Sequence, residues 1–419
     1  MSGVCVASHS VIETRPADCR WRETSLDGSS FRLLPLALIG LSMNSVSTRQ
    51  AADERSFFLS LACVLVGFGV LMVHSASITS WPTNFERVYL TKHLTFLAIS
   101  LVAASIAAAM PARFWFRAAP WLFAVSMLLL IAVLIPGVGT TVKGATRWLR
   151  LGTMSLQPSE LAKLTLPLLL ARMIVVRREQ IRCWFRGTVP FAIPIAAAVG
   201  LVLVEPDLGT ALFVAGSGVL ALYYGGWPMR NYLIGVAAAV PAVVFAITTH
   251  SYRLRRITDY VSVWTDLQHS DAWQLKQSLL SLGHGGVWGV GLGRGTLKLS
   301  FLPESNTDFV YAVVGEELGL AGTVGVAALW CGIFWSGSRL FRHFRPDCFA
   351  SIAGLTLITQ IVVQAVLNAW VVTAIVPTTG VPHPLVSYGG TSLLVSMLSF
   401  GVMISLSRAE PDLDAVTLE

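Results

Sequence analysis

A small number of ionisable side chains lie within or at the ends of long apolar segments of this 419-residue sequence. A charge is costly in such a place and indicates a function more often than elsewhere. Asp308 directly precedes one apolar run, in the segment Pro303–Phe309. It could cap the helix that follows, but Thr307 or Asn306 could serve equally well and leave Asp308 for chemistry. A single well-placed carboxylate can act as a general base that takes a proton from a hydroxyl group.

Basic side chains gather in two segments between apolar runs, the Gly-rich loop Pro136–Pro158 and the long segment His250–Asp308. The candidates, with the tryptophan beside them, are Lys143, Arg147, Trp148, Arg253, Arg255 and Arg256. Cations beside one carboxylate suit an anionic, phosphate-bearing substrate and a single proton transfer. We therefore expect these residues, Asp308 and the proline-rich, non-helical loop Pro377–Pro384 to surround one outward-facing polar site.

Five other ionisable residues lie inside or beside apolar runs, and we interpret them as a structural polar network. Glu160 and Lys163 are three residues apart on an expected helix, so they share a face and either neutralise each other or join the site. Asp207 either caps the next helix or pairs with Lys163. Glu316 and Glu317 lie well inside a later apolar run and need partners, either Lys or Arg of other spans or backbone N–H groups.

These charges stand out because the chain contains so few of them. Only 13% of the residues are charged and 54% are hydrophobic, with a mean hydropathy of +0.67, whereas about a quarter of the residues of a soluble domain are charged. This composition excludes a disordered protein, a nucleic-acid-binding arm and an ordinary cytosolic enzyme. The apolar runs predict an all-α, polytopic membrane protein with about ten spans. They cover 59–74, 94–110, 121–135, 161–176, 189–204, 208–224, 232–248, 310–335, 352–376 and 385–406.

The positions of the basic residues predict the orientation of the spans. Arginine is concentrated in the short loops after the second, fourth and eighth spans, and the positive-inside rule places those loops in the cytoplasm. Both termini are then cytoplasmic, and the net charge of +7 reflects topology rather than nucleic-acid binding. The six cysteines form no CxxC pair, so neither a disulfide framework nor a metal site is expected.

The sequence divides into three parts on this interpretation. Residues 1–55 form a flexible cytoplasmic N-terminal tail, in which Met43 is an alternative start site. Residues 56–408 form the ten-helix membrane domain, with a large external loop at 250–308 between the seventh and eighth spans. Residues 409–419 form a cytoplasmic C-terminal tail.

Six stretches together resemble the SEDS family of membrane glycosyltransferases, which includes FtsW, RodA and SpoVE. They are 144–149, 157–164, 206–211, 277–295, 302–319 and 377–394. The resemblance covers about Ser56–Arg408. The amino-acid sequences of Gly291–Gly295 and Val314–Glu317 are more similar to FtsW than to RodA. In the family's pattern Asp308 matches the catalytic aspartate, and Arg147 with Trp148 matches an external Arg-Trp element. Glu160, Lys163 and Asp207 match its internal polar group.

The resemblance implies an activity and a set of partners. The activity is the joining of lipid II, an undecaprenyl-pyrophosphate-linked disaccharide peptide, into β-1,4 glycan strands on the outer face of the cytoplasmic membrane in cell division. The partners are a class B penicillin-binding protein that crosslinks the strands, other divisome proteins and membrane lipid, with no nucleic acid. No cofactor is required, although a divalent cation would be compatible with the site.

The implied reaction is an inverting displacement. The 4-hydroxyl of the acceptor N-acetylglucosamine attacks C1 of the donor N-acetylmuramic acid, with Asp308 as general base. Undecaprenyl pyrophosphate leaves, and the arginines at 147, 253, 255 and 256 are the cations available to stabilise it.

The sequence also departs from the family's pattern and leaves alternatives open. The departures are Glu205 for glutamine, Trp273 for tyrosine, Asn306 for histidine, Thr379 for lysine and His383 for an apolar residue. The alternatives are a lipid II transporter, a side-wall polymerase of the RodA type and a catalytically silent scaffold. The lack of an internal repeat and the gathering of charges at one membrane face favour chemistry over transport.

Overall fold

The computed structural model describes residues 40–77, 85–142, 145–152, 154–181, 184–249, 251–266, 272–299 and 304–409. Lys143 and the C-terminal segment 410–419 lie outside these residues, as do most residues of the tail expected at 1–55. The chain divides into two compact units, Met1–Thr48 and Arg49–Glu419. Of the first unit only the start of helix α1 (Gly40–Ala76) is described, and the other helices belong to the second.

Each of the ten apolar runs forms a helix, which confirms the all-α, polytopic fold class. Among the described residues, six of these helices are long and apolar enough to cross a membrane: α1, α2 (Phe85–Ala109), α3 (Ala112–Leu134), α7 (Met229–Thr248), α10 (Val310–Arg342) and α11 (Phe349–Val372). Three are shorter apolar helices: α5 (Val189–Val204), α6 (Leu208–Tyr224) and α12 (Gly390–Leu406). The tenth, α4 (Pro158–Val176), begins at a proline, which suits the first helical position.

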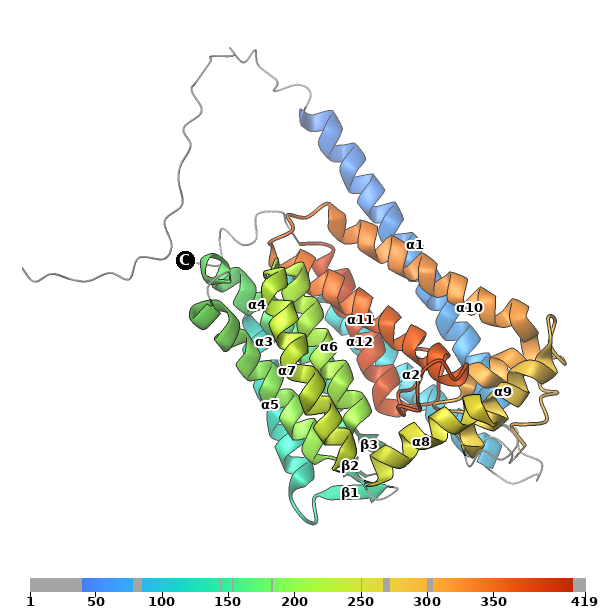
Figure 1. The fold of residues 1–419 in the computed structure, drawn as a ribbon. Helices are drawn as coiled ribbons and strands as arrows, with labels where there is room; N and C mark the ends of the chain where they lie inside the picture. The colour runs from blue at the N-terminus through green and yellow to red at the C-terminus, as the bar shows by residue number, and fades with distance from the viewer. Residues whose placement is uncertain are drawn as a thin grey trace, which may run out of the picture. The chain divides into compact units, whose positions relative to one another are not determined.

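The helices pack in neighbouring groups, which the ribbon makes visible (Figure 1). α2 packs along α12 and α3 along α4, while α4 and α6 contact each other and α11. The α2–α12 contact is close, because a Cβ on Gly401 would lie 2.3 Å from the carbonyl oxygen of Ala104. Small residues permit such close approach of helices in membranes.

The loop expected at Pro136–Pro158 contains a small sheet that the sequence analysis did not predict. Strands β1 (Gly139–Val142), β2 (Ala145–Leu151) and β3 (Met154–Leu156) form an antiparallel sheet in the order β1-β2-β3. Thr391 at the start of α12 holds this sheet, since its Oγ1 donates to the carbonyl of Ser155 at 2.9 Å and accepts from the amide of Gln157 at 3.1 Å. The sheet therefore fixes where β2 presents Arg147 and Trp148.

The expected external segment 250–308 also folds. It contains α8 (Ser251–Thr265) and α9 (Trp273–Gly285), followed by irregular turns that lead into α10. α8 runs across the ends of the membrane-spanning helices near the β-sheet (Figure 1). α9 packs against α10 and α11, and α8 contacts α7, so both helices of the segment are bound to the helix bundle.

The eighth span is interrupted, contrary to the single continuous helix expected from its apolar run. Within α10, Gly319 has φ 67° and ψ −162°, which breaks the helical ladder. The segment after α9 repairs the break, because the amides of Val290 and Gly291 donate to the carbonyls of Glu316 and Glu317 at 3.0 Å each. A Cβ on Gly319 would lie 2.4 Å from a backbone nitrogen of this segment.

The carboxylates beside the break have partners from the same segment. Glu316 accepts from the amides of Thr296 at 2.8 Å and Leu297 at 3.2 Å. Glu317 accepts from Lys298 Nζ at 2.6 Å, and both side chains of this ion pair are fully buried. Backbone donors were among the expected partners, but the cation comes from the external segment rather than from another span. These residues anchor 286–299 to α10.

Candidate active site

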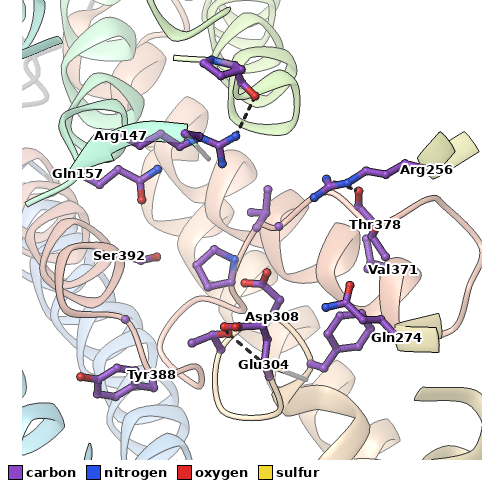
Figure 2. Close-up of a pocket in the computed structure, with 18 of the residues that line it drawn as sticks. Arg147, Gln157, Arg256, Gln274, Glu304, Asp308, Val371, Thr378, Tyr388 and Ser392 are labelled. Atoms are coloured by element: carbon purple, nitrogen blue, oxygen red, sulfur yellow. Dashed lines mark hydrogen bonds between the residues drawn. The ribbon is translucent and has the colours of Figure 1, made fainter. Parts of the chain in front are cut away.

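A cavity of about 720 Å³ opens between the ends of the helices, the β-sheet and α8. Most of the expected site residues meet there, together with several that the sequence analysis did not select. Figure 2 shows Asp308 near the middle, with Arg147 and Arg256 on either side above it. The charged and polar lining residues are Arg147, Trp148, Gln157, Tyr252, Arg253, Arg256, Gln274, Glu304, Thr307, Asp308, Thr378, Tyr388 and Ser392. They come from segments far apart in the sequence.

Asp308 lines this cavity. The residue in the cap position of α10 is Phe309, whose side chain makes no capping hydrogen bond. The loop Pro377–Pro384 passes beside the carboxylate, since a Cβ on Gly380 would lie 3.7 Å from Asp308 Oδ2. The backbone carbonyl of Asp308 accepts from the side-chain amide of Asn368 at 2.7 Å. The backbone of Asp308 is thus tied to α11, while its carboxylate faces the cavity.

A second carboxylate, Glu304, lies in the same wall just below Asp308 (Figure 2). Its backbone has φ 59°, an uncommon value for a non-glycine residue. The carbonyl of Glu304 accepts from the amides of Thr307 and Phe309 at 3.1 Å each, and its Oε2 accepts from Thr307 Oγ1 at 2.9 Å. This turn presents two acidic groups to the cavity where the sequence analysis selected one.

Arg147 lines the cavity, but its guanidinium group is largely engaged by the turn between α5 and α6. Its Nε donates to the carbonyl of Glu205 at 3.1 Å, and one terminal nitrogen donates to that of Pro206 at 2.8 Å. The other terminal nitrogen lies 3.2 Å from Asp207 Oδ2. Asp207 also caps α6 by accepting from the amide of Thr210 at 3.1 Å. Asp207 therefore pairs with Arg147 and not with Lys163, the alternative that the sequence left open.

Glu205 is buried beside this arginine. Its side chain is 1% exposed, and neither carboxyl oxygen has a hydrogen-bond partner among the described residues. Burial, together with the charge of Asp207, raises the pKa of Glu205 to about 8 against the opposing effect of Arg147. The Glu205 carboxyl group is therefore mostly protonated at neutral pH, and the one full negative charge in the turn belongs to Asp207.

The three arginines of α8 divide between two environments. Arg253 and Arg256 line the cavity, whereas Arg255 is exposed and does not. Arg253 donates to the carbonyl of Ala246 at 2.8 Å. Arg256 donates to the carbonyl of Thr378 at 3.1 Å and to the hydroxyl of Tyr252. Trp148 also lines the cavity, from β2, and Lys143 lies outside the described residues.

The pair Glu160 and Lys163 lies behind the cavity wall. Lys163 Nζ is 2.7 Å from Glu160 Oε2, and both residues are almost completely buried. Lys163 also donates to Gln364 Oε1 at 3.2 Å, which links the pair to α11. Gln157 occupies the cap position of α4, although its side chain makes no capping bond. The pair neutralises itself inside the protein, as the spacing of the two residues suggested.

Comparison with known proteins decides the family. A family model described as "Cell cycle protein", which covers FtsW, RodA and SpoVE, matches residues 55–411. The chain belongs to this family. This confirms the resemblance drawn from the six sequence stretches.

Curated relatives agree over most of their length. A "Probable peptidoglycan glycosyltransferase FtsW" of Geobacter metallireducens is 37% identical and covers 83% of this chain and 93% of its own. A protein with the same name from Trichlorobacter lovleyi is 35% identical, with coverage of 85% and 93%. "Stage V sporulation protein E" of Bacillus subtilis is 32% identical, with coverage of 83% and 95%.

Solved structures share the fold. A chain described under "Structural coordination of polymerization and crosslinking by a peptidoglycan synthase complex" aligns with a TM-score of 0.69 at 27% identity. It covers 84% of this chain and 96% of its own. The rod shape determining protein RodA of Thermus thermophilus aligns with a TM-score of 0.62 at 27% identity, with coverage of 84% and 95%. This protein is thus a multi-pass membrane protein of the RodA and FtsW type.

Proposed function

We propose that this protein is a peptidoglycan glycosyltransferase that joins lipid II into β-1,4 glycan strands during cell division. The observation that carries the proposal is the place of Asp308, whose carboxylate faces a cavity that also contains two arginines of α8. The names of the curated relatives support the same reaction. The cavity lies among segments that the positive-inside rule assigns to the outer face of the cytoplasmic membrane.

Asp308 acts as the general base in this proposal. The acceptor sugar's 4-hydroxyl gives its proton to the carboxylate as its oxygen forms a bond to C1 of the donor sugar. The bond between C1 and the pyrophosphate oxygen breaks, and undecaprenyl pyrophosphate leaves with the electron pair. Attack from the opposite side of C1 inverts the configuration and gives the β linkage. Asp308 returns its proton to water before the next cycle.

The negative charge that develops on the pyrophosphate needs cations. Arg253 and Arg256 are better placed for this role than Arg147, because Arg147 is largely engaged by the carbonyls and carboxylate of the 205–207 turn. Arg255 lies away from the cavity, so we do not assign it a role in binding. A divalent cation held near Glu304 and Asp308 would serve the same purpose, since carboxylate oxygens suit Mg²⁺.

The proposal includes a class B penicillin-binding protein and the other divisome proteins as partners. One structural relative is described as a complex that coordinates polymerization and crosslinking. A glycan strand that grows on the outer face needs such a crosslinking enzyme beside it. With the cavity on the outer face, the positive-inside rule places both termini of the chain in the cytoplasm.

Transport of lipid II is the main alternative function. Transporters often bind their substrate at broken helices near the membrane midplane. α10 is broken at Gly319, but the backbone of 286–291 fills the break and pairs its exposed carbonyls. The cavity instead lies at one end of the bundle, beside a carboxylate suited to chemistry. These observations favour polymerisation over transport.

The function can be tested with the purified protein in lipid vesicles, alone and with the class B penicillin-binding protein of the same organism. We expect fluorescent lipid II to form strands that a muramidase cleaves. A second set of vesicles carries lipid II in the inner leaflet only, and a quencher outside reports its translocation. Translocation without strand formation in either preparation would overturn the proposal in favour of transport. The absence of both would favour a scaffold.

A further inference from the structure

One buried asparagine connects two segments that line the cavity, the turn that contains Asp308 and the loop Pro377–Pro384. Asn368 of α11 is 1% exposed, and its Nδ2 donates to the carbonyl of Asp308 at 2.7 Å and to that of Val381 at 3.0 Å. Both partners are acceptors, so the atom between them must be the amide nitrogen with its two hydrogens. Asn368 therefore joins the backbone of Asp308 to the loop Pro377–Pro384.

A glutamine one turn earlier holds the same loop. Gln364 Nε2 donates to the carbonyl of Pro382 at 3.0 Å, and its Oε1 accepts from Lys163 Nζ at 3.2 Å. Lys163 is in turn fixed by Glu160 at 2.7 Å. Residues four apart lie on one face of a helix. The buried ion pair and Gln364 therefore form one continuous set of hydrogen bonds that reaches the loop at Pro382, and Asn368 binds the neighbouring carbonyl of Val381.

α8 holds the other side of this loop region. Three side chains of α8, also four residues apart, donate to backbone carbonyls between residues 374 and 378. Arg256 donates to Thr378, Tyr260 donates to Ile375 at 2.8 Å, and Trp264 donates to Ala374 at 3.0 Å. These bonds fix residues 374–378, whereas only the α11 amides reach 381 and 382 among the hydrogen bonds described here. The α11 amides thus hold the part of the loop that lies nearest Asp308.

We propose that Asn368 is a positioning residue that sets the distance between the Asp308 carboxylate and the loop Pro377–Pro384, with Gln364 supporting the loop alone. This inference rests on the proposed function, in which Asp308 is the base. Neither amide lines the cavity, so both act through the backbone groups they bind. A shift of about 1 Å in a catalytic group can lower a rate about 100-fold.

The test compares variants of the full-length protein in complex with its penicillin-binding protein. Asn368→Leu keeps the approximate volume but removes both donors. We expect kcat for strand formation to fall about 10–100-fold, while KM for lipid II changes less than threefold. Asn368→His retains a donor and should recover part of the loss. Gln360→Leu is the matched control, because Gln360 is also buried on α11 but donates to the carbonyl of Lys163 and not to the loop.

Hydrogen–deuterium exchange supplies a second measurement that does not depend on activity. Asn368→Leu should speed exchange in both 304–309 and 377–384, whereas Gln364→Leu should speed it only in 377–384. Equal exchange in the parent and Asn368→Leu would overturn the inference, as would a kcat loss in Gln360→Leu as large as that in Asn368→Leu. If Asp308→Asn polymerises normally, the proposed base fails, yet the exchange pattern still decides whether Asn368 joins the two segments.

Discussion

At the scale of single residues, burial and charge explain which ionisable groups serve structure and which face the cavity. Arg147 and Asp207 pair with each other and shape a turn, whereas Asp308 lines the cavity together with Arg253 and Arg256. The sequence located all of these residues, because charges in an apolar chain are conspicuous. It could not assign their partners, since the alternatives for Asp207 were a helix cap or a pair with Lys163, and its cation is Arg147. The partner depends on how β2 reaches the α5–α6 turn.

Glu205 gives a pH-dependent prediction at this scale. Its pKa is about 8 in the folded protein and 4.5 in an unfolded chain, so between these pH values the folded state keeps a proton that the unfolded state has lost. The free energy of unfolding should therefore fall as pH rises from 4.5 to 8, and the loss should level off above pH 8. Glu205→Gln cannot ionise and should lack this decline. Its thermal midpoint should match that of the parent near pH 4.5 and exceed it by several degrees at pH 8.5.

Thermal unfolding of the detergent-purified protein across this pH range measures the effect. Glu179→Gln is the control, because Glu179 is exposed and its replacement should leave the pH dependence unchanged. A midpoint difference between Glu205→Gln and the parent that stays constant with pH would contradict the assignment of a raised pKa to Glu205.

Asn368 and Gln364 show what residue patterns could have revealed. Both are amides four apart in an apolar helix, which is itself a signal that they face polar groups. Their partners are backbone carbonyls of Asp308, Val381 and Pro382, and no side-chain pattern identifies these. Glu304 was visible in the same motif as Asp308, but its place in the cavity depends on a turn with positive φ.

At the scale of secondary structure, the ten membrane helices followed from the apolar runs, whereas the helices α8 and α9 and the irregular elements did not. The strands β1 to β3 are short and have glycines beside them, so the sequence predicts a loop there. Only the pairing of the strands with one another makes a sheet. The break at Gly319 carries no proline, and its cause is the approach of 286–291 from another part of the chain. Both misses arise from tertiary contacts that local sequence does not contain.

Gly319 gives a prediction at this scale. Alanine there would require a left-handed backbone and would place its Cβ 2.4 Å from the nitrogen of Gly289. Gly319→Ala should lower stability by about 2 kcal/mol or more. Gly325→Ala is the matched control on the same helix, since a Cβ there meets nothing within 4 Å. Its stability should stay the same or rise by up to about 1 kcal/mol. The thermal midpoints of both variants measure the effect. Equal midpoints would contradict the close approach of Gly319 to the backbone of Gly289.

At the scale of the whole molecule, composition and the positive-inside rule predicted the ten helices and a consistent arrangement of their connections. Ion pairs support this arrangement, because they join segments assigned to the same side. Arg178, after α4, pairs with Asp347, after α10. Arg339 near the end of α10 lies 2.8 Å from Glu54 near the start of the first span. Which side these segments face remains a prediction of the charge rule.

Cysteine labelling tests the orientation. In a variant without the native cysteines, Thr258→Cys on α8 should react with a membrane-impermeant maleimide in spheroplasts. Glu179→Cys, after α4, should react only once the membrane is permeabilised. Both positions are exposed, so access depends on the membrane alone. The reverse pattern would invert the topology and place the cavity in the cytoplasm.

In the proposed function, Asp308 is the general base of a glycan polymerase. The most direct measurement is the rate of strand formation from lipid II by the purified complex carrying Asp308→Asn. Asp259→Asn on α8 is the control, because it makes the same change outside the cavity. We expect a loss of at least about 100-fold for Asp308→Asn, with an unchanged thermal midpoint and near-normal activity for Asp259→Asn. Strand formation by Asp308→Asn at the parent's rate would contradict this role of Asp308.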